Sequence, residues 1–532
     1  MQAFQVWAPH PTSVALKIGD QVYPMAPSAG GWWRVSIPDS EPGTDVEYQF
    51  VVDDGAAYPD PRSPWQPRGI HGPSRTVDHR RFPWTDQGWE APPLSSAVIY
   101  ELHTGTFTLE GTFDAAVEKL DLLADLGVTH IEIMPVAEFP GAWGWGYDGV
   151  DLFAPHHAYG GPDGLKRLVD ACHARGLAVL LDVVYNHLGP DGNYLGKFGP
   201  YFNDHHQTVW GSAINLDGPG SQEVRRFLLD NAVMWLRDYH MDGLRLDAVH
   251  AIVDSSPIHF LEELAIVVDE LQSQLGRRLG LIAESDLNDP RVVIPRDGGG
   301  YGLHAQWSDD FHHALHCMLT GETSGYYADY GSVSDLAQAL TGVFVYNNRF
   351  SSFRGRMHGR PVENLSFDHF LGYLQNHDQI GNRAQGERIH QMVSTQVAMI
   401  GAALVLTAPF VPMIFQGEEW GASSPFPYFT DHEDLELAQM VRQGRWEEFA
   451  AFGWNPEQIP DPQDEQTFLS AKLNWDERER EPHSSMLEWY RSLIRLRKEH
   501  PDLSPGSTGP AHVDFDVEAN WLRVQRWGLV VL

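Results

Sequence analysis

The chain is predicted to be an α/β protein built on a (β/α)8 barrel, a TIM barrel, with an N-terminal β-sandwich domain and the start of a C-terminal β domain. Three observations lead to this prediction. The length of 532 residues exceeds the roughly 250 of a typical barrel and leaves room for smaller units. Near residue 97 short strand-like segments give way to apolar strands that alternate with helical stretches. Polar clusters then follow several of these strands.

Residues 1–92 are predicted to form the β-sandwich. Four short segments are rich in aromatic and β-branched residues and are separated by clusters of Gly, Pro and Asp. They are residues 3–8, 14–18, 32–37 and 46–52. This spacing is typical of a small sandwich. A proline-rich linker at residues 89–94 ends the unit.

Residues 93–502 are predicted to form the barrel. The candidate strands are residues 98–103, 130–136, 178–184, 243–249, 280–285, 304–308, 373–377 and 412–416. The amphipathic stretches between them, which indicate helices, include residues 113–126, 165–174 and 223–239. Strands that alternate with helices indicate a parallel sheet with crossover helices. An open, doubly wound sheet is the alternative, since the same alternation fits it.

Residues 485–500 are predicted to be the last barrel helix, and residues 501–507 a linker. Residues 513–517 and 521–531 have the pattern of β-strands. So few strands rarely form a stable sheet domain alone. Residues 503–532 are therefore predicted to begin a C-terminal β domain, and packing of these strands onto the barrel is the alternative.

The composition excludes some classes of partner. With 37 Lys+Arg against 72 Asp+Glu, the formal net charge is −35, which repels nucleic acid and anionic membranes. No secretory signal pattern is found at the start, and the most apolar stretch, residues 399–415, is interrupted by Pro409 and Pro412. Cys172 and Cys317 form no disulfide framework, so we expect a cytoplasmic protein. The 18 Trp residues favour a neutral ligand such as a sugar.

Four polar clusters stand at the C-terminal ends of predicted strands, where barrel enzymes place their active sites. They are residues 182–187, 243–247, 283–286 and 375–378. A single Asp at a strand end is usually a turn or cap residue. Here, however, every cluster carries a carboxylate, and the four are Asp182, Asp247, Glu284 and Asp378. We expect them to line one mouth together with Arg245, His187 and His377.

Converging carboxylates bind a divalent metal ion or perform acid, base and nucleophilic chemistry on a glycosidic bond. Arg245 stands two residues before Asp247, and therefore on the same face of a strand. Its charge disfavours a metal ion and keeps Asp247 ionised, as a nucleophile requires. Glu284 would then be the general acid. The clusters predict a retaining glycosidase, with the two carboxyl groups about 5–5.5 Å apart, and no metal or cofactor.

In their order along the chain, the four clusters resemble the four motif regions of the α-amylase clan, glycoside hydrolase family 13. The resemblance spans the whole predicted barrel and implies a glycoside hydrolase. It implies that Asp247 is the nucleophile, Glu284 the general acid/base and Asp378 the carboxylate that holds and distorts the sugar at the cleavage point. The N-terminal unit is similar to the carbohydrate-module-like domain of branching and debranching enzymes.

The same resemblance assigns substrate contacts. Arg245, His187 and His377 resemble the residues that hold the nucleophile and the hydroxyls of the cleaved sugar. Asp182 resembles a supporting carboxylate, and Tyr147 resembles the stacking platform. Ordinary α-amylases carry a Lys-His pair after the nucleophile, whereas this chain has His250-Ala251, so contacts on the leaving-group side must differ and His250 is a candidate. A tight calcium site is not expected, although Asn186 occupies a position that often binds calcium in relatives.

Further motifs narrow the resemblance within the clan. They are residues 144–149, 186–194, 242–251, 376–383, 429–432 and 442–449. They look like those of clan members that hydrolyse the α-1,4 bond next to the terminal trehalose of maltooligosyl trehalose. The resemblance implies this substrate, trehalose as the product, and a functional pairing with a maltooligosyl trehalose synthase. A glucan branching or debranching enzyme is the alternative, and a non-catalytic glucan-binding barrel is a third hypothesis, disfavoured because all three catalytic-type carboxylates are present.

Some aromatic and basic residues have two interpretations. Trp143 and Trp145 lie in a glycine-rich loop and are predicted to face the sugar, although core packing is the usual role of Trp. Phe353 and Arg354, in a late barrel loop, are candidates for holding the trehalose end, with a solvated loop as the alternative. The His pairs at residues 156–157, 205–206 and 312–313 lack the spacing of a zinc site.

Overall fold

The computed structural model describes residues 2–37, 45–53, 55–450, 458–503 and 511–531. At its centre eight parallel strands close into a barrel, in the order β9, β10, β13, β16, β17, β18, β21, β22. These strands are Ile99–Leu102, His130–Ile133, Ala178–Val183, Gly243–Leu246, Gly280–Ala283, Ala305–Trp307, Phe370–Tyr373 and Val411–Phe415. The last strand pairs with the first, Met413 opposite Ile99. This closure confirms the barrel and excludes the doubly wound sheet.

The seventh strand begins earlier than the sequence predicted. The prediction was residues 373–377, but β21 is Phe370–Tyr373, and residues 375–378 lie in the following loop and at the start of helix α10 (His377–Gly381). The cause is a helix cap. The side chain of Asn376 accepts the backbone N–H groups of Asp378 and Gln379, each at 3.0 Å, and so ends the extended chain.

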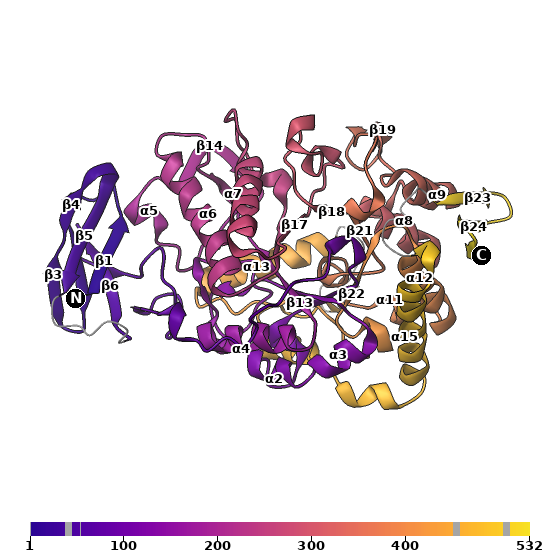
Figure 1. Cartoon of the computed structure of the whole chain (residues 1–532), viewed down its shortest axis with the longest axis horizontal. Helices are drawn as coiled ribbons and strands as arrows, with labels where there is room; N and C mark the ends of the chain where they lie inside the picture. Colours follow the sequence, from indigo (N-terminus) through magenta and orange to yellow (C-terminus); the bar gives the residue numbers. More distant parts are fainter. Residues whose placement is uncertain (1, 38–44, 54, 451–457, 504–510, 532) are drawn as a thin grey trace.

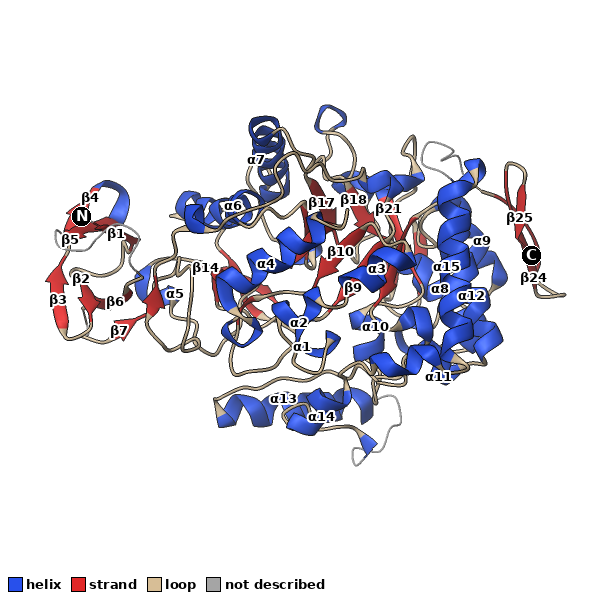
Figure 2. Ribbon diagram, turned by 60° about the horizontal axis from the view of Figure 1, so that its bottom comes forward, coloured by secondary structure: helices blue, strands red, loops and turns tan. Residues whose placement is uncertain are grey.

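Helices surround the barrel strands (Figure 2). In the described residues they are α1 Thr104–Phe107, α2 Phe113–Val117, α3 Leu120–Leu126, α4 Gly161–His173, α5 Leu195–Phe198, α6 Ser221–Asp238, α7 Phe260–Leu275, α8 Asp309–Thr320, α9 Val333–Gly342, α11 Ile389–Met392, α12 Thr395–Thr407, α13 Leu435–Ala450, α14 Glu465–Ser470 and α15 His483–Glu499, besides α10. The predicted helix at residues 113–126 is therefore two helices. The predicted last barrel helix corresponds to α15, which packs beside α12. No helix of the described chain is long and apolar enough to cross a membrane.

The N-terminal strands form two sheets at one end of the molecule (Figure 1). One contains β1 (Gln2–Trp7), β5 (Trp32–Ile37) and β4 (Ala26–Ser28), and the other contains β3 (Gln21–Pro24), β2 (Val14–Ile18), β6 (Glu47–Val52), β7 (Ala57–Tyr58) and β8 (Ser74–Arg75). Phe4, Leu16 and Phe50 fill the core between them. Trp7 packs edge-on against Tyr201 of the barrel domain, with ring centroids 5.3 Å apart. The boundary at residue 92 remains a prediction.

Three C-terminal strands lie at the opposite end (Figure 1). They are β23 (His512–Asp516), β24 (Trp521–Arg526) and β25 (Leu529–Val531). Arg526 donates to the backbone carbonyl groups of Thr407 and Ala408 at 3.2 and 3.0 Å, so this sheet packs onto the barrel at the end of α12. Residues 504–507 of the predicted linker lie outside the described residues. The boundary at residue 503 remains a prediction.

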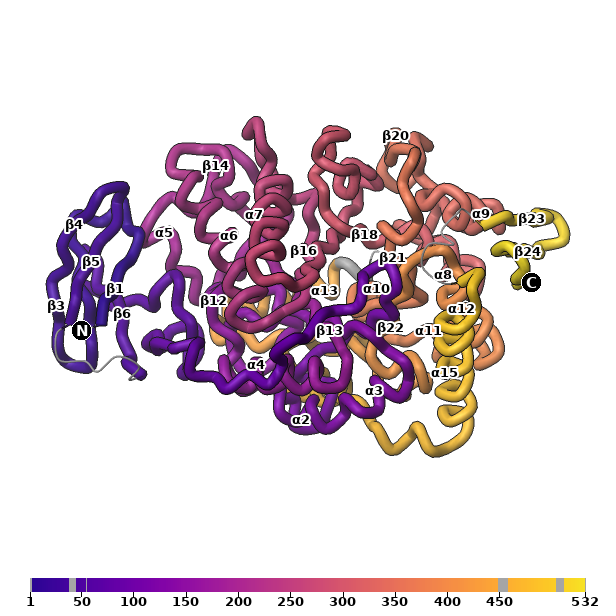
Figure 3. The backbone as a smooth tube through the Cα atoms, in the orientation of Figure 1, coloured from indigo at the N-terminus to yellow at the C-terminus, as the bar shows by residue number. Residues whose placement is uncertain are grey.

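Two hairpins project from loops that follow barrel strands. They are β14–β15 (Phe202–Thr208 and Gly211–Ile214) and β19–β20 (Arg349–Ser351 and Arg356–His358). The first follows β13 and the second follows β18, so both belong to the C-terminal face of the barrel. They lie along the same edge of the molecule in Figure 3. This face carries the carboxylates predicted from the sequence.

Candidate active site

Arg245 on β16 binds three carboxyl groups. Its Nη1 donates to Asp182 Oδ2 at 2.6 Å and to Asp247 Oδ1 at 3.0 Å, and its Nη2 donates to Glu284 Oε2 at 2.8 Å. The guanidinium lies 4.3 Å from the centroid of the Trp307 ring. Because Asp182, Asp247 and Glu284 stand on or directly after β13, β16 and β17, the parallel barrel brings their side chains to one face. The structure thus unites three of the four predicted carboxylates around one cation.

The backbone after Asp247 contributes to this arrangement. Ala248 adopts a left-handed conformation, with φ of 37°, which is unfavourable for a residue with a Cβ. In this conformation its N–H donates to Glu284 Oε2 at 2.8 Å. The Glu284 carboxylate therefore accepts hydrogen bonds from both Arg245 and the chain beside Asp247. We infer that the strained residue fixes Glu284 relative to Asp247.

Asn186 holds the other oxygen of Asp247. Its Nδ2 donates to Asp247 Oδ2 at 2.9 Å, and its Oδ1 lies 2.8 Å from His187 Nδ1. The His187 ring stacks on Trp210 with centroids 4.7 Å apart and planes at 11°. Burial lowers the pKa of His187 to about 4, so the ring is neutral near pH 7. Trp210, at the tip of the β14–β15 hairpin and 47% exposed, was missed by the sequence analysis.

Tyr147 and His377 form a second layer of contacts. Tyr147 Oη donates to Asp182 Oδ2 at 2.6 Å and lies 2.8 Å from His377 Nε2. The two rings stack with centroids 5.2 Å apart. Behind them, His377 donates its backbone N–H to Glu101 Oε2 at 3.1 Å and pairs through Nδ1 with Glu101 Oε1. Burial lowers the pKa of His377, but the Glu101 carboxylate raises it by more, so the net direction is upward.

Asp378 is positioned by helix α10, where Asn382 Nδ2 donates to its Oδ1 at 2.8 Å. Burial raises the pKa of Asp378, and the nearby Glu284 carboxylate raises it further. Burial also raises the pKa of Asp182, to about 7, against the opposing effect of Arg245. Burial thus raises the pKa of two carboxyls in this group, Asp378 and Asp182. Such a group suits acid–base chemistry.

Three further predicted contacts lie together beside Glu284. His250 is exposed, and its Nδ1 accepts the backbone N–H of Asp286 at 3.2 Å. Arg354, in the β19–β20 hairpin, pairs with the Asp286 carboxylate. Phe353 is 55% exposed at the tip of the same hairpin. Asp286, two residues after Glu284, thus connects His250 and Arg354.

The two predicted tryptophans are placed differently. Trp145 is only 5% exposed, stacks on Phe426 with centroids 5.4 Å apart and meets the His377 ring edge-on. It supports His377 from behind, which corrects the predicted sugar-facing role. The cause is the apolar cluster beneath the loop, which buries the indole. Trp143 is half-buried and lies parallel to Phe468, with centroids 5.8 Å apart, and its contact with substrate remains a prediction.

One group in the described residues has the composition of a metal site, namely Glu138, His156 and His157. His157 Nδ1 lies 2.6 Å from Glu138 Oε1, and the His157 N–H donates to Glu138 Oε2 at 2.8 Å. Two ligands of one tetrahedral zinc ion would be about 3.3 Å apart. The His157 contacts are shorter and are hydrogen bonds that fix the loop, whereas His156 Nδ1 lies 3.2 Å from Glu138 Oε1.

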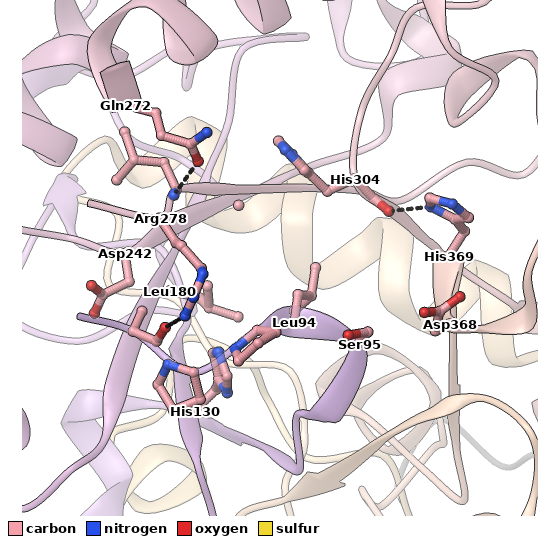
Figure 4. Close-up of a pocket in the computed structure, with 15 residues that line it drawn as sticks. Leu94, Ser95, His130, Leu180, Asp242, Gln272, Arg278, His304, Asp368 and His369 are labelled. Atoms are coloured by element: carbon pink, nitrogen blue, oxygen red, sulfur yellow. Dashed lines mark hydrogen bonds between the residues drawn. The ribbon is translucent and has the colours of Figure 1, made fainter. Parts of the chain in front are cut away.

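A cavity of about 420 Å³ lies at the opposite, N-terminal face of the barrel (Figure 4). His130, Asp242 and His304, which stand at the beginnings of strands, line it together with Leu94 of the linker. Asp242 accepts from Trp89 Nε1 at 2.9 Å, so its charge is used to hold the linker. In barrels this face serves stability, and none of the predicted site residues lines the cavity.

Comparison with known proteins agrees with this geometry. Residues 77–207 match the family model for the alpha amylase catalytic domain. The malto-oligosyltrehalose trehalohydrolase of Rhizobium sp. strain M-11 is 50% identical over 539 residues, covering 99% of this chain and 90% of the relative. The protein of the same name from Arthrobacter ramosus is 52% identical over 506 residues, covering 94% and 88%.

A crystal structure of a Salmonella typhimurium protein, provisionally named alpha amylase, superposes with a TM-score of 0.90 and 41% identity, covering 97% of this chain and 88% of that one. The 1,4-alpha-glucan branching enzyme of Vibrio parahaemolyticus is 32% identical over 354 residues, covering 58% of this chain and 46% of the relative. The likeness to a branching enzyme is therefore partial and more distant.

Proposed function

Since the chain belongs to the malto-oligosyltrehalose trehalohydrolases, glycoside hydrolases of the α-amylase family, we propose that it hydrolyses the α-1,4 bond next to the terminal trehalose of maltooligosyl trehalose. Trehalose is released, and the new reducing end keeps its anomeric configuration. The observation that carries this proposal is the convergence of Asp182, Asp247 and Glu284 on Arg245. A nucleophile, an acid and a fixed cation are the parts that a retaining glycosidase needs.

In the first step Asp247 attacks the anomeric carbon of the sugar at the cleavage point. Arg245 and Asn186 each hold one of its oxygens, which keeps the carboxylate ionised and aimed. As the carbon–oxygen bond to trehalose breaks, Glu284 transfers its proton to the departing oxygen. A covalent bond between Asp247 and the glucan remains.

In the second step a water molecule replaces the departed trehalose. Glu284, now a carboxylate, takes a proton from this water, whose oxygen attacks the anomeric carbon and releases Asp247. His377, Tyr147 and Asp378 surround the place of the cleaved sugar and supply its hydroxyl contacts. Hydrogen bonds that strengthen as the sugar distorts supply further stabilisation of the transition state.

A product assay tests this function. Maltooligosyl trehalose and a plain maltooligosaccharide of equal length are supplied separately, and products are identified by chromatography and by NMR of the first-formed anomer. We expect trehalose from the first substrate, with the α-anomer at the new reducing end. Preferred hydrolysis of the plain chain, or formation of α-1,6 bonds, would contradict the proposal and favour the branching or debranching alternative.

Two wider roles are part of the proposal. A substrate with trehalose at its end requires an enzyme that converts a terminal maltose unit to trehalose, so we infer a functional pairing with a maltooligosyl trehalose synthase. We also place the protein in the cytoplasm. The two cysteines, Cys172 and Cys317, are free and buried, which suits a reducing compartment.

A further inference from the structure

A fifth carboxylate lies on the same rim of the barrel. Asp309 is the first residue of α8 and follows β18 directly. Its Oδ1 accepts a hydrogen bond from Tyr373 Oη, at the end of β21. The Tyr373 ring meets Trp307 at 5.4 Å, and Trp307 is the ring beneath the Arg245 guanidinium. Asp309 is therefore joined to the centre of the site by a continuous series of contacts.

The groups that face Asp309 come from three neighbouring elements. Glu284 and Asp286 follow β17, Asp378 belongs to α10, and Tyr373 ends β21. On its own helix, His313 hydrogen-bonds to the backbone carbonyl of Asp309. The three carboxyl groups among these, Glu284, Asp286 and Asp378, each raise the pKa of Asp309. Both Glu284 and Asp378 therefore act electrostatically on Asp309, and its Tyr373 bond occupies only one of its oxygens.

We propose that Asp309, held by Tyr373, contacts the sugar on the leaving-group side of the cleavage point and contributes to the choice of trehalose as leaving group. This inference rests on the proposed function. The side follows from its neighbours. Glu284 must reach the oxygen that departs, and Asp286, next to it, binds His250 and Arg354. The nucleophile, by contrast, accepts from Asn186, which lies after β13 and in turn contacts His187.

The protonation of Asp309 suits this contact. Burial raises the pKa of the Asp309 carboxyl to about 8, with a further contribution from Glu284. Near pH 7 the group is therefore a neutral carboxylic acid, which donates one hydrogen bond while its other oxygen accepts from Tyr373. A neutral acid adds no charge to a crowded acidic site. Carboxylic acids kept protonated in this way serve as hydrogen-bond donors in other enzymes, and a sugar hydroxyl accepts such a bond.

The experiment measures kcat/KM for maltooligosyl trehalose and for a plain maltooligosaccharide in the wild type and three variants. Asp309→Ala removes the contact, and we expect kcat/KM for maltooligosyl trehalose to fall about tenfold, mainly through KM, while the plain chain is less affected. Asp309→Asn keeps a neutral donor and acceptor and should retain the wild-type ratio of the two substrates. Tyr373→Phe, like Asp309→Ala, should lower the ratio of kcat/KM for maltooligosyl trehalose to kcat/KM for the plain chain.

Tyr490→Phe is the matched control, because it breaks a buried Tyr–carboxylate bond of 2.8 Å with Glu418, and neither residue is assigned to the site. Its substrate ratio should equal that of the wild type. If Asp309→Ala lowers kcat/KM equally for both substrates, or not at all, the role of Asp309 is contradicted, while the proposed function is not affected. If the alanine variant fails to fold, the other two variants decide, because Tyr373→Phe must narrow the ratio and Asp309→Asn must preserve it. Failure of the wild type to release trehalose would overturn the proposed function as well.

A pH profile gives an independent readout. In the wild type, activity on maltooligosyl trehalose should fall as the pH rises through about 8, where Asp309 loses its proton. Asp309→Asn cannot ionise, so this part of the alkaline decline should disappear. An unchanged alkaline limb in Asp309→Asn would contradict a substrate contact by the protonated acid. A merely structural role would leave the limb unaltered.

Discussion

The carboxylate of Glu101 binds His377 twice, through the backbone N–H at 3.1 Å and through Nδ1 of the ring. Glu101 stands on the first barrel strand and His377 follows the seventh, 276 residues later. Both are buried. This contact fixes the ring so that Nε2 points to Tyr147 at 2.8 Å, and the negative charge favours the doubly protonated imidazole.

Glu101→Gln should therefore weaken activity through His377. Glutamine retains the size and one acceptor but removes the charge that raises the pKa of His377. The His377 ring will then lose its proton at a lower pH than in the wild type. The alkaline limb of the pH–kcat/KM profile should therefore move to lower pH. At pH 7 we expect a loss of about tenfold. Glu322→Gln, which alters another Glu–His pair, at 2.7 Å from His316, is the control, and equal profiles in both variants would contradict the role of Glu101.

Asp247→Asn and Glu284→Gln should each abolish trehalose release. Either change removes a group that forms or breaks a bond, and a loss of at least about 10³-fold in kcat is expected. Each variant keeps the shape of the side chain, so the circular dichroism spectrum should be unchanged. Asp114→Asn alters an exposed partner of Arg167, 2.7 Å away, and should retain full activity. Release within tenfold of the wild-type rate by either site variant would contradict the proposed mechanism.

Trp210→Ala should impair substrate binding more than stability. The indole is 47% exposed and stacks on His187 at 4.7 Å, so part of the ring stays accessible beside a predicted substrate contact. Loss of one stacking surface should raise KM about three- to tenfold and leave kcat nearly unchanged. Initial rates over a range of substrate concentrations measure both constants. Trp521→Ala, at a 44% exposed residue of the C-terminal sheet, is the control, and a large fall in kcat for Trp210→Ala would point instead to a role in aligning His187.

Much of the barrel and its carboxylates could be predicted from sequence because both leave local signals. Apolar segments that alternate with amphipathic stretches indicate strands and helices, and a polar residue at the end of an apolar segment has a defined place in a barrel. Asp182, Arg245 and Asp247 were found in this way. Their contacts at 2.6 and 3.0 Å depend only on neighbouring strands, β13 and β16.

Other parts of the site depend on contacts that no local pattern indicates. Glu101 lies inside an apolar strand, and only the closed barrel brings it to His377. Trp210 belongs to the β14–β15 hairpin, and the sequence of this hairpin does not indicate that it folds over His187. Trp145 was predicted to face the sugar because its loop is rich in glycine, but Phe426, 281 positions later in the chain, covers its ring. Long-range packing decides such orientations.

Asp242→Asn should lower stability without altering the chemistry. At the N-terminal face, Asp242 Oδ2 lies 2.9 Å from His173 Nε2 and accepts the N–H of Val179 at 2.8 Å. The side chains of Asp242 and His173 are each 1% exposed. Breaking a buried ion pair by removing one charge costs about 3–5 kcal/mol. We therefore expect the free energy of unfolding in urea to fall by about 3 kcal/mol, with kcat/KM unchanged at 25 °C.

The pH dependence of this loss has a defined sign. The pKa of Asp242 is lowered in the folded protein, where burial opposes but hydrogen bonds and the charge of His173 prevail, so its stabilisation is lost as the pH falls. The pKa of His173 is raised, because its bonds to Asp242 and Asp86 outweigh burial, so its stabilisation is present below the ordinary His pKa and is lost as the pH rises through the higher folded value. The difference between variant and wild type should therefore be largest between about pH 4 and 6.5. Asp238→Asn, at a surface pair with Arg237, is the control and should change the free energy of unfolding by less than about 1 kcal/mol. An equally small effect of Asp242→Asn across this pH range would show that the buried pair does not stabilise the barrel.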